Sequence, residues 1–172
     1  MNTGQSLITI LAMLLLSILI LRVNNVYLNT GSALSYSKLE IIATSLASSR
    51  LDEICTKAYD ENSVSAAIND SSKFTSPSKL GPESGEVYPD FDDVDDYNKF
   101  SINDSVKLLS NNPAEVFRDS CIVQYVAISG GKDFVTNYQT WNKKITVMVW
   151  DKNKSMPDTV TLSRIFSYWY FK

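Results

Sequence analysis

The start of the chain constrains its structure most, because it is strongly apolar and almost free of charge. Residues 7–21 read LITILAMLLLSILIL, and Arg22 is the one charged side chain among the first 37 residues. A helix that crosses a membrane needs about 20 apolar residues. The run reaches that length from Gln5 through Leu28 if the long Arg22 side chain extends to the lipid headgroups. We therefore expect a hydrophobic helix over residues 5–28.

A cleaved secretory signal and a plain membrane anchor are the two simpler interpretations of this run. A secretory signal fits poorly, because no Lys or Arg precedes the apolar residues and no A-x-A cleavage site follows them. A plain anchor on a globular domain stays open at this point.

Apolar positions continue at helical spacing beyond the first run, and no proline occurs before Pro77. A continuous helix from Gln5 to Ala58 has a length of about 80 Å. Its first half is apolar on all sides, and residues 29–59 form an amphipathic continuation. The apolar stripe of this second half consists of Leu39, Ile42, Ala43, Leu46, Ala47, Leu51, Ile54 and Ala58.

Residues 60–116 are rich in Ser, Asn, Asp, Pro and Gly, which predicts an irregular connecting region. Residues 83–96 hold seven acids and no base. Carboxylates at alternate positions can converge on a hard cation such as Ca²⁺, although the Gly and distal Glu of an EF-hand loop are missing. The alternative is a solvated acidic loop whose Asp side chains cap turns. The candidate calcium ligands are Asp92, Asp93, Asp95 and Asp96.

Residues 117–172 carry strand signals. Polar and apolar positions alternate over residues 117–129, Gly130-Gly131 marks a turn, and residues 145–150 and 159–171 are rich in β-branched and aromatic side chains. The sequence thus predicts an α+β fold, with a long N-terminal α-helix packed on a small antiparallel sheet of three to four strands.

Composition argues against several classes of function. The chain has no His, which excludes Ser-His-Asp triads and His-based zinc sites. Its two Cys cannot form a four-thiolate metal site, and 16 basic against 19 acidic residues leave no charge excess for nucleic acid. Carboxylates are plentiful enough for a glycosidase-like pair, but no motif places two across a cleft. We expect no enzymatic activity, no cofactor other than the candidate Ca²⁺, and no nucleic-acid partner.

Four short segments carry a resemblance to a known family. The start Gly4-Gln5-Ser6-Leu7-Ile8, followed by a long apolar helix, resembles that of a type IV pilin or pseudopilin. Residues 46–61 (LASSRLDEICTKAYDE) resemble the end of the long helix in minor pilins of the mannose-sensitive haemagglutinin type, and residues 91–98 (FDDVDDYN) resemble their aspartate-rich segment. Residues 160–169 (VTLSRIFSYW) resemble the last strand of many pseudopilins.

The resemblance implies a structural subunit of an extracellular type IV pilus or of a secretion pseudopilus. A prepilin peptidase would remove residues 1–4 by cleavage after Gly4 and methylate Gln5. The subunit would wait in the inner membrane until an assembly platform moved it into an extracellular or periplasmic helical filament with copies of itself or related pilins. The expected assembly helix contains Leu7, Ile8, Thr9, Leu11, Leu14, Leu15, Leu16, Ile18 and Leu19.

The chain departs from the family pattern at two places. Thr9 stands where the family has a Glu that pairs with a neighbouring subunit's N-terminal amine, and Thr9 can make only a neutral hydrogen bond. Secretion pseudopilins without this Glu are typically tip subunits, so tip and main-subunit roles both stay open. The short leader lacks basic residues, and Arg22 lies on the wrong side of the span for the positive-inside rule.

Two further interpretations remain at this point. Cys55 and Cys121 can form a disulfide if the domain is extracytoplasmic, a cross-link of about 4 kcal/mol; the alternative is two buried thiols. A membrane-anchored extracytoplasmic binding or adhesin module that acts without polymerisation is the alternative function.

Overall fold

The computed structural model describes residues 2–107, 114–153 and 158–168, and it divides into two compact units, Met1–Leu39 and Glu40–Lys172. The helix α1 (Thr3–Cys55) is 53 residues long. Every residue of the first unit from Thr3 onward belongs to it. The predicted long helix is therefore confirmed, with a start two residues earlier and an end three residues earlier than the Gln5–Ala58 range.

The helix α1 ends where its last turn tightens. The amides of Thr56 and Lys57 donate to carbonyls three residues back, at 3.1 Å each, instead of four residues back. The Thr56 hydroxyl also donates to the Glu53 carbonyl at 2.6 Å, so this carbonyl accepts both the amide and the side chain of Thr56.

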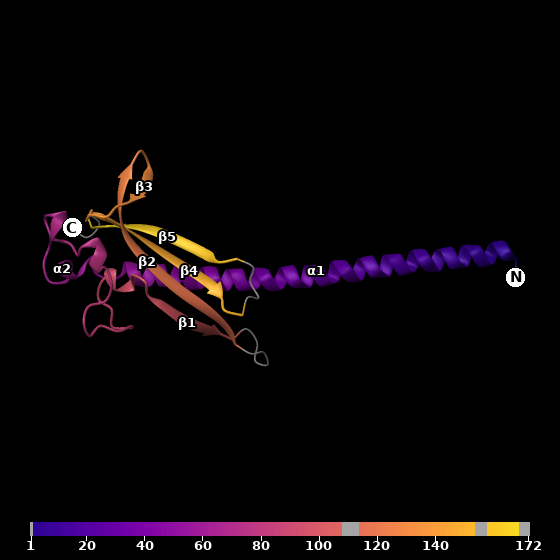
Figure 1. Cartoon of the computed structure of the whole chain (residues 1–172). Helices are drawn as coiled ribbons and strands as arrows, with labels where there is room; N and C mark the ends of the chain where they lie inside the picture. The colour runs from indigo at the N-terminus through magenta and orange to yellow at the C-terminus, as the bar shows by residue number, and fades with distance from the viewer. Residues whose placement is uncertain (1, 108–113, 154–157, 169–172) are drawn as a thin grey trace. The chain divides into compact units, whose positions relative to one another are not determined.

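The second unit contains a five-stranded sheet in which every pairing is antiparallel. The main path runs β1-β2-β4-β5, and β3 pairs with the far end of β2 (Figure 1). The strands are β1 (Ser101–Val106), β2 (Glu115–Ser129), β3 (Lys132–Val135), β4 (Asn142–Asp151) and β5 (Val160–Ser167). With the C-terminal part of α1 against one face, this is the predicted α+β class.

The structure has more strands than predicted. Strand β1 lies in the stretch 60–116, which was expected to be irregular. The strand was missed because its sequence, SINDSV, is mostly polar; it lies at one edge of the main sheet path, where it pairs with β2. Strand β3 extends the hairpin at Gly130-Gly131, whose φ values of 58° and 75° need glycine. The same stretch also holds the short helices α2 (Glu61–Val64), η1 (Ser71–Lys73), η2 (Pro77–Lys79) and η3 (Asp95–Tyr97). In the predicted last strand, Tyr168 follows the end of β5, and residues 169–171 lie outside the described residues.

The core of the second unit lies between α1 and the sheet. Ala43, Ala47 and Ile54 of α1 are fully buried, and the two small alanines let the helix come close to the strands. Strand β4 buries alternate residues, which include Ile145 and Val147, so one sheet face is covered by the helix. The stripe predicted from helical spacing is thus the packed face.

Arg50 attaches α1 to the sheet. Its guanidinium donates to Asp119 of β2 at 2.6 Å, to Glu53 at 2.5 Å and to the Tyr88 hydroxyl at 2.9 Å. The guanidinium also lies 5.2 Å and 5.7 Å from the ring centres of Tyr88 and Phe100. One side chain of α1 therefore holds β2 and the acidic loop together.

Replacing Ile54 with Ala tests the helix–sheet core. Ile54 is fully buried, so Ile54→Ala leaves a cavity and lowers the free energy of unfolding by about 2–5 kcal/mol. Denaturant unfolding of the full chain in detergent micelles, followed by tryptophan fluorescence, measures the loss. The matched control is Ile41→Ala on the same helix, where the side chain is 69% exposed and the expected change is about 0.5 kcal/mol or less. Equal losses for the two variants would contradict this packing.

Candidate functional site

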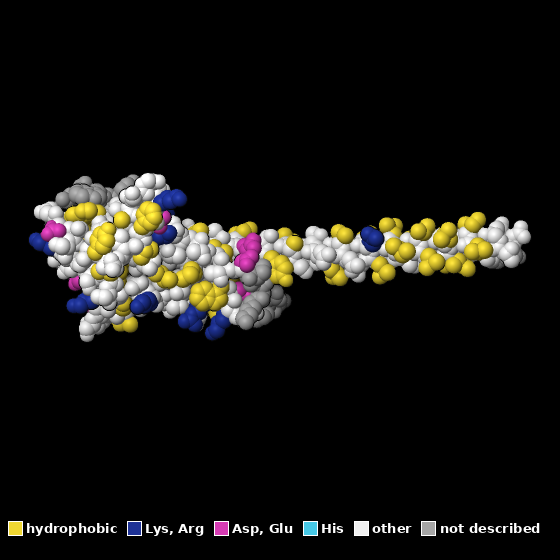
Figure 2. Space-filling model, turned by 45° about the horizontal axis from the view of Figure 1, so that its top comes forward, with side chains coloured by type: hydrophobic (Ala, Val, Ile, Leu, Met, Phe, Trp, Pro, Cys, Tyr) yellow, Lys and Arg dark blue, Asp and Glu magenta, His cyan; other side chains and the backbone are white. Residues whose placement is uncertain are grey.

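The first candidate site is the apolar surface of α1 in the first unit. Every large hydrophobic side chain from Leu7 to Leu28 is between 51% and 77% exposed. Figure 2 shows hydrophobic side chains spread over the surface of this stretch. By length and composition the helix could cross a membrane. Soluble monomers rarely expose so large a continuous apolar surface, which is typical of a segment that lipid or other protein covers.

The predicted assembly residues all lie on this exposed surface. The eight apolar ones are Leu7, Ile8, Leu11, Leu14, Leu15, Leu16, Ile18 and Leu19. The ninth, Thr9, donates its hydroxyl to the Ser6 carbonyl at 2.8 Å, and Ser17 bonds the Met13 carbonyl in the same way. These hydroxyls therefore need no partner outside the helix.

The predicted processing residues Gly4 and Gln5 lie in the first turn of α1. The Gln5 amide donates to the Asn2 carbonyl at 2.9 Å, and nothing of the described chain lies within 4 Å of a Cβ built on Gly4. Cleavage after Gly4 stays a prediction.

The second candidate site is the acidic loop. Asp93, Asp95 and Asp96 are fully buried, whereas Asp92 is exposed. The Asp93 carboxylate accepts the amides of Asp95 and Asp96 at 2.6 and 3.2 Å. The Asp96 carboxylate accepts those of Asp92 and Asp93 at 3.1 and 3.2 Å. The Asp93 and Asp96 side chains cap turns of their own loop, as the alternative interpretation expected, but they are buried and not solvated.

Asp95 is held by a buried lysine on β4. The Lys143 ammonium lies 2.5 Å from an Asp95 oxygen, 3.0 Å from an Asp60 oxygen and 2.7 Å from the Tyr59 carbonyl oxygen. All four residues are buried, and the Tyr59 ring centre lies 4.3 Å from the ammonium nitrogen. An ammonium has three donors, and here each has an acceptor.

The two carboxylates of this centre differ in their surroundings. Burial raises the pKa of Asp95 to about 7 against the opposing charge of Lys143. Burial also acts on Asp60, but the charge of Lys143 and the hydrogen bonds from Lys143, Thr75 and Tyr125 outweigh it and lower its pKa. The surroundings therefore favour the charged form of Asp60 more than that of Asp95.

Sequence reasoning missed Lys143 as a functional residue. The signal that could have found it is its place in β4, in register with the inward-facing Ile145, Val147 and Val149. A lysine at such a position is buried and needs a carboxylate partner.

The structure corrects the predicted calcium ligands. Asp92 and Asp96 each place an oxygen within 4.8 Å of one on Glu86, whereas Asp93 and Asp95 belong to no such group among the described residues, and Asp95 is paired with Lys143. The oxygens of Glu86, Asp92 and Asp96 lie within 4.8 Å of one another. A second group, formed by Glu61, Glu83 and Glu86, also has oxygens within 4.8 Å of one another, so Glu86 belongs to both groups. The glutamates were missed as ligands because they come from two separate segments, the start of α2 and the loop that holds Glu83 and Glu86.

Electrostatic crowding is strong in this group. Burial is the largest cause that raises the pKa of Glu83 and of Asp96, and the neighbouring Glu86 carboxyl adds to both shifts. We call Glu61, Glu83, Glu86, Asp92 and Asp96 the carboxylate cluster.

The predicted disulfide is wrong for this structure, in which Cys55 and Cys121 are both free thiols. Cys121 is buried in β2 with its sulfur 3.8 Å from an Asp119 oxygen, and burial raises its pKa. Cys55 lies at the half-buried end of α1 beside Arg164 of β5. The two side chains therefore have different neighbours, as expected for the alternative of two unpaired thiols.

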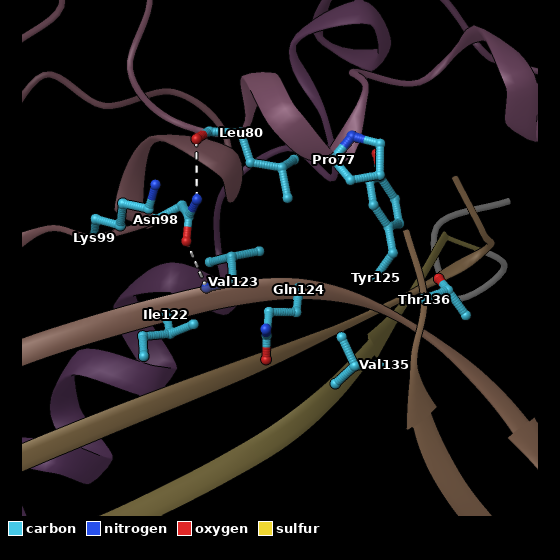
Figure 3. A pocket seen from close by; sticks show the side chains of 10 residues that line it. All are labelled: Pro77, Leu80, Asn98, Lys99, Ile122, Val123, Gln124, Tyr125, Val135 and Thr136. Carbon is cyan, nitrogen blue, oxygen red and sulfur yellow. Dashed lines mark hydrogen bonds between the residues drawn. The ribbon is translucent and has the colours of Figure 1, made fainter. Parts of the chain in front are cut away.

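A shallow pocket of about 260 Å³ lies beside β2 (Figure 3). On its wall the Asn98 side chain donates to the Leu80 carbonyl at 3.0 Å and accepts the Val123 amide at 3.2 Å. Lys99 is the one charged residue among the ten that line it. The pocket therefore does not bring together a pair of carboxylates.

Fold and sites define a class of protein: an α+β unit whose first helix continues into a stretch apolar enough to cross a membrane. No family model, curated protein or solved structure matches the chain.

Neighbouring lysines on β4 provide a matched test of the buried centre. Lys143→Met leaves Asp60 and Asp95 buried without their cation and lowers the free energy of unfolding by about 3–5 kcal/mol. Lys144→Met removes a partly exposed pair with Asp133, at 2.7 Å, and is expected to cost about 1 kcal/mol or less. Denaturant unfolding of both variants measures the difference. Similar losses would show that Lys143 does not hold the segments together.

Proposed function

We propose that the chain is a structural filament subunit of the type IV pilin or pseudopilin kind, which polymerises through its apolar N-terminal helix. The observation that carries this proposal is the exposed apolar surface from Leu7 to Leu28 on a helix that continues without a break to Cys55. It acts by assembly and not by catalysis.

Helix length favours assembly over simple anchoring. A membrane span needs about 20 residues, whereas α1 has 53. A filament core uses such a helix twice, first in lipid and then against the helices of neighbouring subunits. Burial of the same apolar side chains stabilises both states.

The hydroxyl side chains of the helix are compatible both with lipid and with the packed helices of a filament. Thr9, Ser17 and Thr30 each donate their hydroxyl to a carbonyl of the preceding turn at 2.8 Å. In lipid or among packed helices, an unbonded hydroxyl is costly, so these internal hydrogen bonds lower the cost of burial.

The resemblance of residues 4–8, 46–61, 91–98 and 160–169 to pilin segments supports the same proposal. It adds a prepilin peptidase, an assembly platform, an inner-membrane stage, and an extracellular or periplasmic filament. Partners in the filament are copies of the chain or related subunits.

One observation favours the alternative, a membrane-anchored binding or adhesin module that does not polymerise. Ile128, Phe134, Val135 and Tyr138, on or beside the β2–β3 hairpin, are 52–59% exposed. Such apolar side chains at the surface are typical of a binding surface. The alternative predicts a chain that stays in the membrane fraction.

Replacing Leu15 with Asp tests assembly directly. A charge at this position is costly among packed apolar helices, so Leu15→Asp is expected to abolish filaments. Immunoblots of sheared surface material and of the membrane fraction measure the outcome. The control is Ile128→Asp, an equally drastic change on the β2–β3 hairpin that leaves filaments intact under this proposal. Normal filaments from Leu15→Asp would refute a core role for the helix.

Mass spectrometry of the mature protein tests the processing step. The expected result is loss of residues 1–4 and a methylated amine on Gln5. Detection of an N-terminus that still carries Met1 contradicts cleavage after Gly4, although it leaves assembly itself possible.

A further inference from the structure

We propose that the carboxylate cluster of Glu61, Glu83, Glu86, Asp92 and Asp96 is a calcium-binding site. Glu61 begins α2, Glu83 and Glu86 lie in the loop before the aspartates, and Asp92 and Asp96 flank the start of η3. The site does not rest on the proposed filament function, since a chain that never polymerises could bind the ion equally well.

Distances within each of the two groups of three carboxylates suit one ion, and Glu86 is common to both groups. Oxygens of Glu61, Glu83 and Glu86 lie within 4.8 Å of one another, and so do those of Glu86, Asp92 and Asp96. Calcium binds oxygens at about 2.3–2.6 Å, so two ligands of one ion are at most about 5 Å apart. Glu86 belongs to both groups, and one of its oxygens accepts the Glu83 amide at 2.9 Å, which fixes its position.

Unpartnered buried oxygens are the second observation that points to a ligand. Asp96 is fully buried; its Oδ2 accepts two backbone amides, and its Oδ1 has no hydrogen-bond donor in the described chain. Glu61 Oε2 and Glu83 Oε2 are likewise buried atoms without a donor. Buried polar atoms in native proteins nearly always have a partner. A cation between these oxygens supplies it.

No basic side chain neutralises the cluster. In the described ranges, no Lys or Arg nitrogen lies within 4.0 Å of these five carboxylates. Lys79 lines the same hollow as Glu61 and Glu83 but forms no ion pair with them, and Lys57 is bonded to the Phe91 carbonyl. Five carboxylates so close together repel one another unless a cation or protons intervene.

Ligand chemistry selects calcium among the common metal ions. The cluster offers only oxygen ligands, which suit hard cations rather than Zn²⁺ or Cu²⁺. Calcium accepts six to eight oxygens in a flexible arrangement, whereas Mg²⁺ demands a near-ideal octahedron at about 2.0–2.1 Å. Glu61 and Glu83 also line an open hollow of about 480 Å³, through which an ion can enter.

The bound ion would join two parts of the chain, the start of α2 and the acidic loop at residues 83–96. Glu61 follows the end of α1, Glu83 and Glu86 come from the loop, and Asp96 precedes β1. Carboxylate sites of extracellular modules bind calcium at about 10⁻⁴–10⁻³ M, the range expected here. Calcium therefore stabilises the connection between the helix and the sheet.

Calcium titration of the full chain in detergent micelles tests the site. Isothermal titration calorimetry with CaCl₂ is expected to show one ion per chain. At a calcium concentration tenfold above Kd, Tm should rise by about 3–5 °C. Glu86→Gln and Asp96→Asn should each weaken binding by about tenfold or more, because each removes a central charged ligand. Asp90→Asn is the matched control, an exposed aspartate of the same loop outside the cluster, and it should bind as the unchanged chain does.

Folding of the variants is checked in EDTA. The substituted amide side chain keeps an oxygen for the Glu83 amide, so Glu86→Gln should unfold in EDTA at or above the Tm of the unchanged chain. The proposal is overturned if the unchanged chain shows no calcium-dependent Tm shift. It is also overturned if Glu86→Gln binds calcium normally, or if Mg²⁺ at equal concentration gives the same shift.

Discussion

The buried Lys143 ammonium is the interaction on which the second unit depends. It bonds the Tyr59 carbonyl and the Asp60 carboxylate directly after α1, and the Asp95 carboxylate of the acidic loop. A buried charge without its partners costs several kcal/mol, so these segments must meet on β4. The end of the helix, the loop and the sheet are thereby held in one arrangement. Arg50 is a second buried cation that joins the helix to the sheet, since its guanidinium donates to Asp119 of β2.

The two parts of α1 have different surroundings. In the second unit the apolar stripe of α1 packs against the sheet, as the full burial of Ala43 and Ile54 shows. The large apolar side chains from Leu7 to Leu28 have no such cover in the described chain and are more than half exposed. Removing an apolar surface of that extent from water, in lipid or among other helices, is energetically favourable. The proposed filament subunit satisfies both requirements in succession, whereas the proposed calcium site concerns only the second unit.

Sequence patterns predicted the elements with strong periodicity. The long helix followed from its apolar run and the absence of proline, and β2, β4 and β5 from alternation. Strand β1 was missed because SINDSV holds little apolar signal. Lys143 was missed although its inward-facing place in β4 was a signal. The three glutamates of the carboxylate cluster were missed because the contacts that bring them together join separate parts of the chain. The predicted disulfide was wrong because oxidising conditions permit a disulfide but do not determine whether the Cys55 and Cys121 side chains meet.

The central claim is that the apolar helix forms the core of a filament. Cryo-electron microscopy of sheared surface filaments from cells that make this chain tests it most directly. The account predicts density for the chain in which residues 7–28 pack against the same stretch, or its equivalent, in neighbouring subunits. Filaments in which this stretch lies on the outer surface, or a chain found only in the membrane fraction while filaments form without it, would contradict the account.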